Sequence, residues 1–256
     1  MQKYRTDIAW STADSITVHG LSVPDEIIGK VSFGDMAFLE IKKRLPTRAE
    51  STMFNAMLVT LVEHGLTPST LAARMTYLGA PEAMQAAVAA GLCGLGSVFV
   101  GSVEGSARML YGLLPKPDGC ADLQALATAA AAHHKERRMI VPGIGHPFHK
   151  PIDPRTPSLL RIASETGFSG QYVKLIQEIA VATAADKGVD LPVNATGMLG
   201  ALCCEMGFDW RVCRGLGVMA RAVGLVGHIL EEASNPMARS LWIDTEQKAT
   251  EHFRNT

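Results

Sequence analysis

The sequence predicts an all-α fold. Strand-like alternation of apolar residues occurs only within residues 14–33, and beyond it apolar residues recur at helical spacing. Apolar residues make up 47% of the 256 residues and aromatic residues only 6%, alongside 24 Gly and 12 Met. A large core with so few rings packs through small and flexible side chains, which favours close-packed helices over a β-sandwich.

The first elements are short. Ile16, Val18 and Val23 alternate with polar residues and predict a hairpin or an extended lead-in. The next segment is a helix that ends near Gly65, because its apolar residues repeat every three or four positions: Met53, Phe54, Met57, Leu58, Leu61 and Val62. Thr67 then caps a new helix, with Pro68 in its first position.

Residues 83–114 form a long apolar stretch rich in Ala and Gly, and we interpret residues 83–103 as a helix. It carries no charge from Ala83 to Val103, about the length that spans a bilayer. Because it contains Gln85 and lacks flanking Lys or Arg, we expect it to be buried in a soluble protein or a subunit interface. Its glycines indicate close backbone approach: Gly91, Gly94, Gly96, Gly101 and Gly105.

Residues 115–120 break the helical pattern, and residues 121–135 resume it. Residues 141–157 contain five prolines and two glycines and are predicted to form a rigid loop. Apolar spacing then marks two more helices, at Val173, Ile176, Ala180 and Ala184 and at Met219, Val223, Val226 and Leu230. We expect the polar tail from Asp244 to be loose.

The charge balance excludes some partners. The 24 basic residues against 25 acidic ones argue against nucleic acid or an anionic membrane as the main partner. The five cysteines show no ligand-like spacing, so we expect reduced and mostly buried thiols in a cytoplasmic protein. The N-terminal residues lack an apolar stretch, and no signal peptide is expected.

The 141–157 loop holds several side chains that could take part in catalysis or ligand binding, namely His146, His149, Lys150, Asp153 and Arg155. His146 can polarise a carbonyl or hydroxyl group, and Arg155 can clamp a carboxylate. Gly143 and Gly145 allow the backbone to approach a ligand.

Two other interpretations of the loop stay open. One is a proline-rich surface loop with incidental histidines. The other is a zinc site, although the spacing of its histidines matches no known metal signature: His133, His134, His146 and His149.

The stretch Gly143-Ile-Gly-His146…Lys150-x-x-Asp153-Pro-Arg155 resembles the G-x-G-H-x-x-x-[KR]-x-x-D-P-R loop of the citrate synthase superfamily. Three more segments resemble that family in the same order, over roughly residues 15–240: Val31-Ser-Phe33…Arg44-Leu-Pro-Thr47, Glu63-His64-Gly65-Leu-Thr-Pro-Ser-Thr and Met219-Ala-Arg221…His228-Ile-Leu-Glu-Glu. The length of the chain and its 91–110 segment are more similar to the citryl-CoA lyase branch, which includes the C-terminal module of ATP-citrate lyase.

The resemblance implies an all-α homodimer, or a higher assembly of dimers, with two domains in each chain. Residues 1–104 and 208–256 would form the large dimerisation domain, and residues 105–207 the small domain that binds coenzyme A. The family uses no metal for the carbon–carbon step. Its substrates are a small acyl-CoA and a dicarboxylate.

The resemblance also implies roles for individual residues. His64 and His146 would grip the oxaloacetate part of the substrate, and Arg155 and Arg221 would pair with its carboxylates. Arg239 would reach into the neighbouring subunit's site. Lys150, Gly143 and Gly145 would lie against coenzyme A.

Two positions depart from the synthase pattern. Phe99 occupies the place of the family histidine that stabilises the acetyl-CoA enolate, as in citryl-CoA lyases, and a phenyl ring cannot donate a hydrogen bond. Thr196 occupies the place of the catalytic Asp in N-V-D-G, and a Thr hydroxyl is a poor general base. His146 or His64 could take one proton of the reaction, and Glu63, Glu104 or a water on Thr196 could return the other. Thr196 could equally be a helix cap or a packing residue.

The leading hypothesis is therefore a CoA-dependent lyase that cleaves citryl-CoA, or a related 3-hydroxy-3-carboxyacyl-CoA, to acetyl-CoA and oxaloacetate. The alternative is a protein with a degenerate site that binds CoA or dicarboxylate without turnover. A synthase is the third and least favoured hypothesis, since it needs replacements at both positions.

Overall fold

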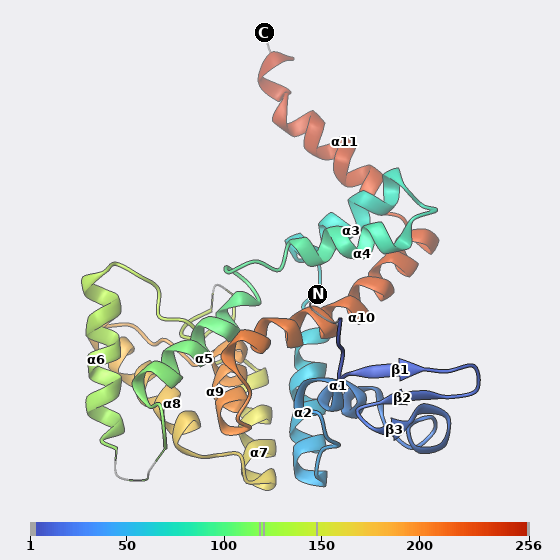
Figure 1. Ribbon diagram of the computed structural model, residues 1–256. Helices are drawn as coiled ribbons and strands as arrows, with labels where there is room; N and C mark the ends of the chain where they lie inside the picture. Colours follow the sequence, from blue (N-terminus) through green and yellow to red (C-terminus); the bar gives the residue numbers. More distant parts are fainter. Residues whose placement is uncertain (1–3, 118, 120, 147, 255–256) are drawn as a thin grey trace.

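The computed structural model describes residues 4–117, 119, 121–146 and 148–254, and its architecture is helical with one small sheet (Figure 1). The prediction of an all-α fold is thereby confirmed. The α-helices are α1 Phe33–Lys42, α2 Arg48–Val62, α3 Pro68–Gly79, α4 Met84–Cys93, α5 Gly101–Leu113, α6 Leu123–Glu136, α7 Arg155–Thr166, α8 Gln171–Lys187, α9 Ala195–Glu205, α10 Cys213–Ser234 and α11 Ala238–Ala249.

The N-terminal sheet contains three short antiparallel strands, β1 Ala9–Ser11, β2 Ile16–Val18 and β3 Leu21–Ser22. The predicted lead-in is thus a meander whose first strand the apolar pattern missed. Val23 begins a one-turn π-helix, Val23–Ile27, instead of continuing a strand. The reason is local, because the Ser22 hydroxyl accepts from the Asp25 N–H and caps this turn.

Helices α2 and α3 begin with side-chain caps. Thr47 and Glu50 form a reciprocal capping box at the start of α2. Thr67 accepts from the Thr70 N–H, and Pro68 opens α3, which confirms the prediction at that position. The chain between the two helices is extended at Glu63 and carries His64.

The predicted single helix over residues 83–103 is wrong. The chain forms α4, then turns through residues 94–100, and then forms α5. The Gly101 N–H bonds back to the Gly96 carbonyl at 3.0 Å and closes this turn. The expected close approach does occur at Gly91 and Gly94, whose backbones pack against Ser69 of α3.

Helix α9 lies at the centre of the main core. Nine of its eleven residues are buried, and it packs against α5, α7 and α8. In Figure 1, α5 to α9 gather on one side, whereas the sheet, α1 to α4, α10 and α11 form the rest of the molecule. The predicted domain boundaries at residues 105 and 207 fall within α5 and just after α9.

The tail is helical rather than loose from Asp244 onward. Helix α11 continues to Ala249, and a 3₁₀ turn, Glu251–Phe253, follows it. Glu232 caps the start of α11 by accepting from the N–H groups of Met237 and Ala238 at 3.0 and 2.9 Å. Figure 1 shows α11 projecting from the body of the molecule.

In the part of the chain that the structure describes, one helical segment, Trp210–Ser234, is long and apolar enough to cross a membrane by length and composition alone. A buried core helix meets the same criteria. Among the cysteines, Cys203, Cys204 and Cys213 are buried and Cys93 is exposed. Cys120 and Pro147 lie outside the described residues.

Candidate active site

The loop of residues 141–154 is anchored by two glycines with left-handed backbones. Gly143 has a φ of +85°, and a Cβ built on it would lie 2.3 Å from the Cα of Gly197. Gly145 has a φ of +80° and packs against Leu191. Gly143 thus lies in close contact with the backbone at the start of α9.

Asn194 ties this loop to α9. Its side-chain oxygen caps α9 by accepting from the Gly197 N–H, and its amide nitrogen donates to the Gly145 carbonyl at 2.6 Å. The Thr196 hydroxyl also donates to the Asn194 side-chain oxygen, at 2.7 Å. Asn194 is thus the helix cap, and Thr196 is a half-buried residue in the first turn.

Asp153 and Arg155 form the second anchor of the loop. Asp153 is fully buried and accepts from two nitrogens of the Arg155 side chain at 3.0 and 2.8 Å and from the Ala195 N–H at 2.8 Å. Burial alone would raise the pKa of Asp153, but Arg155 and the backbone N–H groups outweigh it and hold that pKa at about 2. The carboxylate is therefore ionised near neutral pH and fixes Arg155.

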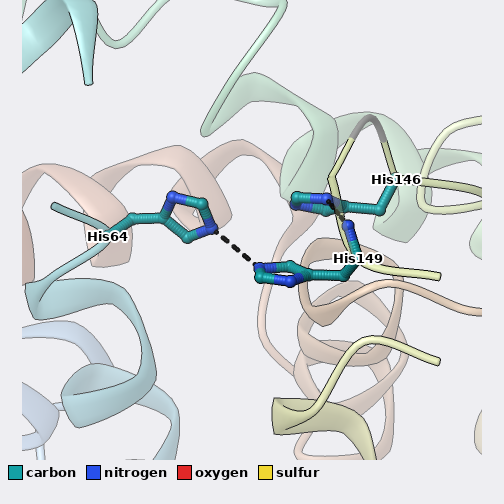
Figure 2. A group of neighbouring side chains, drawn as sticks. All are labelled: His64, His146 and His149. Carbon is teal, nitrogen blue, oxygen red and sulfur yellow. Dashed lines mark hydrogen bonds between the residues drawn. The ribbon is translucent and has the colours of Figure 1, made fainter. Parts of the chain in front are cut away.

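Three imidazoles meet beside this anchor. His64 comes from the segment between α2 and α3, whereas His146 and His149 come from the loop (Figure 2). The Nε2 atoms of His64 and His149 are 3.3 Å apart and form a hydrogen bond. The ring centroids of His146 and His149 are 4.3 Å apart, and those of His64 and His146 are 5.7 Å apart.

The tautomer of His146 is set by the backbone. Its Nδ1 accepts from the N–H groups of Phe148 and His149 at 3.1 and 3.0 Å. A neutral ring whose Nδ1 accepts must carry its proton on Nε2. His146 therefore presents an Nε2–H donor, which suits a group that polarises a carbonyl or hydroxyl oxygen.

Positive charge surrounds His64. Burial and the charge of Arg155 lower the pKa of His64, and Arg221 adds to the effect. Burial also lowers the pKa of His146, with smaller contributions from His149 and Arg155 against the opposing charge of Asp153. The imidazoles of His64 and His146 are consequently biased toward their neutral forms in the absence of an anion.

Arg221 lies on α10, 6% exposed, and donates from Nε to the Leu61 carbonyl at 3.3 Å. Burial lowers its pKa, Glu63 opposes this, and Arg155 adds to it, yet a guanidinium stays charged near neutral pH. Arg155 still has its Nη1 end outside the contact with Asp153. Two arginines from separate helices thus flank one histidine cluster, which suits a ligand with more than one carboxylate.

The contacts described for the three histidines do not include the other predicted site residues. Phe99 is 44% exposed in the turn between α4 and α5. Lys150 and Arg239 are exposed, and Arg239 is the second residue of α11. Of the proposed proton carriers, Glu104 pairs with Arg214 and Glu63 bonds to His228 at 3.1 Å.

His149 and His228 form contacts in the structure that the sequence motifs do not predict. His149 was recognisable as a loop histidine three residues after His146, but its contact with His64 spans 85 residues of sequence. His228 belongs to the motif that begins at Met219 in α10. Its contact with Glu63 depends on how α2 and α10 pack.

Among the described residues, the histidines that could share a metal ion are His64, His146 and His149, whose ligand atoms lie within 4.8 Å of one another. The set differs from the predicted zinc alternative, which used His133 and His134 of α6. His146 suits a metal poorly, because a ligating imidazole normally donates its second nitrogen's proton to an acceptor. Here that nitrogen faces two N–H donors.

Comparisons with known proteins match most of the chain. Residues 32–241 match the family described as citrate synthase, C-terminal domain. A citryl-CoA lyase from Hydrogenobacter thermophilus superposes with a TM-score of 0.80 at 32% identity, covering 91% of this chain and 88% of that one. An ATP citrate lyase from Methanothrix soehngenii, solved with citrate and coenzyme A, has a TM-score of 0.74 at 20% identity, covering 91% of this chain and 39% of that one.

A 2-methylcitrate synthase from Mycobacterium tuberculosis (strain ATCC 35801 / TMC 107 / Erdman) is 27% identical over 220 residues, which are 82% of this chain and 51% of the relative. The chain thus spans about half the length of this curated relative.

Proposed function

The chain belongs to the citrate synthase family, and from this premise we propose that it is a CoA-dependent carbon–carbon lyase of the citryl-CoA lyase type. Its substrate is citryl-CoA or a related 3-hydroxy-3-carboxyacyl-CoA, and its products are acetyl-CoA and oxaloacetate in the case of citryl-CoA. The observation that carries the proposal is the cluster of His64 and His146 flanked by Arg155 and Arg221.

The side chains divide the work of the reaction. Arg155 and Arg221 hold the carboxylates of the substrate, and the Nε2–H of His146 bonds to its hydroxyl oxygen. Loss of the hydroxyl proton lets the bond between the carbinol carbon and the CH₂ carbon of the thioester break. The electron pair of that bond becomes the enolate of the thioester, which then takes a proton on carbon.

Two observations favour cleavage over synthesis. The similarity to a citryl-CoA lyase extends along nearly the full length of both chains at 32% identity. Phe99 also stands at the position where citryl-CoA lyases resemble this chain and where synthases carry a histidine. Lys150 and the loop glycines Gly143 and Gly145 remain the proposed contacts for coenzyme A, and the compartment proposed is the cytoplasm.

Turnover of citryl-CoA tests the proposal directly. Oxaloacetate released from citryl-CoA is reduced by malate dehydrogenase, and the loss of NADH absorbance follows it. We expect cleavage that depends on His146 and Arg221. The absence of turnover with citryl-CoA and with every related 3-hydroxyacyl-CoA would overturn the proposal.

A second candidate function is binding without turnover. It is favoured by Thr196, whose hydroxyl is bonded to Asn194 and which brings no carboxylate to the site. Calorimetry distinguishes the two functions, because tight binding of CoA or oxaloacetate with no cleavage supports binding alone. The same preparations, given acetyl-CoA and oxaloacetate, test the synthase reaction.

A further inference from the structure

Few described groups near the three imidazoles are able to exchange a proton around neutral pH. Asp153 is held ionised by Arg155, and Glu63 is bonded to His228. The Thr196 hydroxyl is committed to Asn194. Proton exchange at this site therefore falls to the histidines themselves.

The three histidines are not equivalent. Two backbone N–H groups bind Nδ1 of His146 and fix its proton on Nε2, so His146 acts as a donor in a single tautomer. His64 and His149 have no such restraint on the nitrogens that face each other. Their Nε2 atoms lie 3.3 Å apart, and both rings are half-buried.

A hydrogen bond between two Nε2 atoms needs one proton and one lone pair. When both rings are neutral, one carries its proton on Nε2 and the other on Nδ1, and each ring keeps its Nδ1 for an outside partner. If both rings were charged, two N–H groups would face each other and repel. The geometry therefore favours one proton shared between the two facing nitrogens.

We propose that His64 and His149 act as one proton-transfer pair, which takes the hydroxyl proton of the substrate and returns a proton to the carbon of the departing enolate. This inference rests on the proposed lyase function. It names the groups that exchange the protons of the reaction, a role for which the Thr196 hydroxyl is unsuited. One proton enters the pair when the hydroxyl is deprotonated, and one leaves it when the enolate carbon becomes CH₃. The pair ends the cycle with the protons it began with.

The charges around the pair support this role. Arg155 of α7 and Arg221 of α10 lie close enough to His64 to lower its pKa, His146 lies beside His149, and Asp153 acts on His146. Glu63, next to Arg221, is a further carboxylate nearby in the described part of the chain. The guanidinium groups disfavour a proton on the empty pair, and substrate carboxylates that neutralise them make the pair a stronger base at the moment it is needed.

A metal ion is the competing explanation for two facing Nε2 atoms. Two nitrogens at about 2.0–2.1 Å from a tetrahedral Zn²⁺ are about 3.3–3.4 Å apart, which the observed separation also fits. The proton explanation is preferred because His146 cannot complete the ligand set without losing its two backbone hydrogen bonds.

Substitutions at His149 test the pair. His149→Gln can still bond to His64 but cannot carry a proton, and His149→Leu can do neither. We expect both to lower kcat by about 10²- to 10⁴-fold with little change in KM, and to flatten the acid limb of the pH–rate profile. His133→Gln, an exposed histidine on α6, is the matched control and should keep wild-type kinetics. If His149→Gln keeps most of the wild-type kcat, His149 only orients His64 and the proposal is overturned.

A second measurement does not depend on turnover. In ¹⁵N-histidine NMR spectra of the wild-type protein with EDTA, His64 and His149 should together take up one proton where two independent histidines would take up two. Two complete and independent titrations would overturn the proposal, and so would stoichiometric Zn²⁺ that survives purification and disappears in His149→Gln. Shared titration in a protein that cleaves no 3-hydroxyacyl-CoA would support the pair and reject the lyase function.

Discussion

Asp153 is the buried carboxylate on which the placement of Arg155 depends. Its oxygens accept hydrogen bonds from Arg155 and from the first N–H of α9, so one side chain orders both the arginine and the contact between loop and helix. Its charge is consequently a requirement for the folded loop.

The pKa of about 2 for Asp153 predicts a pH-dependent stability. Because this value lies below the usual 3.8 to 4 of an unfolded chain, the contribution is present above about pH 4 and is lost as the pH falls toward 2. We expect Asp153→Asn to be less stable than the wild type at pH 7. In urea unfolding, that gap should narrow by about 2 kcal/mol between pH 5 and pH 2. A gap that is constant with pH would show that the carboxylate is not ionised in the folded protein.

Thr196→Asp tests whether this position corresponds to the family's catalytic carboxylate. The new carboxylate would sit in the first turn of α9, where the helix dipole favours negative charge. We expect lyase activity to rise by at least about tenfold or its pH–rate profile to shift. Thr196→Asn is the isosteric control and should produce neither change. No effect of the Asp would mean that Thr196 lies away from the reacting atoms.

Sequence patterns could predict only part of the site. His146 and Arg155 lie in one continuous segment, so the spacing of its residues was enough to predict that they belong to the site. The hydrogen bond between His64 and His149 joins residues far apart in sequence and depends on the packing of α2 against α7. The tautomer of His146 depends on where two backbone N–H groups point, which composition and spacing do not encode.

At the scale of elements, the loop and α9 meet through two glycine backbones. Gly143 and Gly197 are so close that neither has room for a Cβ. Because α9 is itself buried on nearly all sides, it has little freedom to move away.

Gly143→Ala should therefore cost more than backbone strain alone. Gly167 ends α7 with a φ of +80° and nothing within 4 Å of a built Cβ, so Gly167→Ala measures the strain by itself, at about 1 kcal/mol. We expect Gly143→Ala to lose at least about 2 kcal/mol more in urea unfolding, together with most of the cleavage activity. Equal losses for the two variants would contradict the tight contact.

The helices predicted from regular apolar spacing appear where expected, and the errors have physical causes. The stretch 83–114 reads as continuous because Ala and Gly show no break in hydropathy. It is divided because Gly94 packs against Ser69 of α3 and Gly101 bonds to Gly96, and both contacts depend on tertiary structure. The tail from Asp244 has a polar sequence, yet it is helical. Its helix, α11, begins where the Ala238 N–H donates to Glu232, a side chain six residues earlier in the sequence.

At the scale of the whole molecule, α4 and α10 form an exposed apolar face. Met84, Val88 and Leu92 of α4 and Val226 of α10 line an apolar groove, and Val223 and Leu230 are exposed nearby. An apolar surface of this kind is typical of an interface between copies. This surface agrees with the expectation that two copies of the chain pair through the region of α4.

We predict a mass in solution that is twice that of the 27.4 kDa chain, or a multiple of this dimer mass, measured by light scattering. Val226→Glu places a charge in the groove and should yield monomers. Val181→Glu, at a more exposed valine on α8, is the control and should leave the dimer intact. A wild-type monomer would exclude the proposed role of Arg239 in a neighbouring site.

The anchoring of α11 has a mechanical consequence. Glu232 and the buried Arg74 hold the first turn, while the rest of the helix extends from the body as a lever (Figure 1). With a rise of about 1.5 Å per residue, a swing of about 10° about this pivot moves the Cα of Ala249 by about 3 Å but that of Arg239 by less than about 0.5 Å. Arg239 therefore lies next to the pivot, where thermal bending of α11 hardly displaces it.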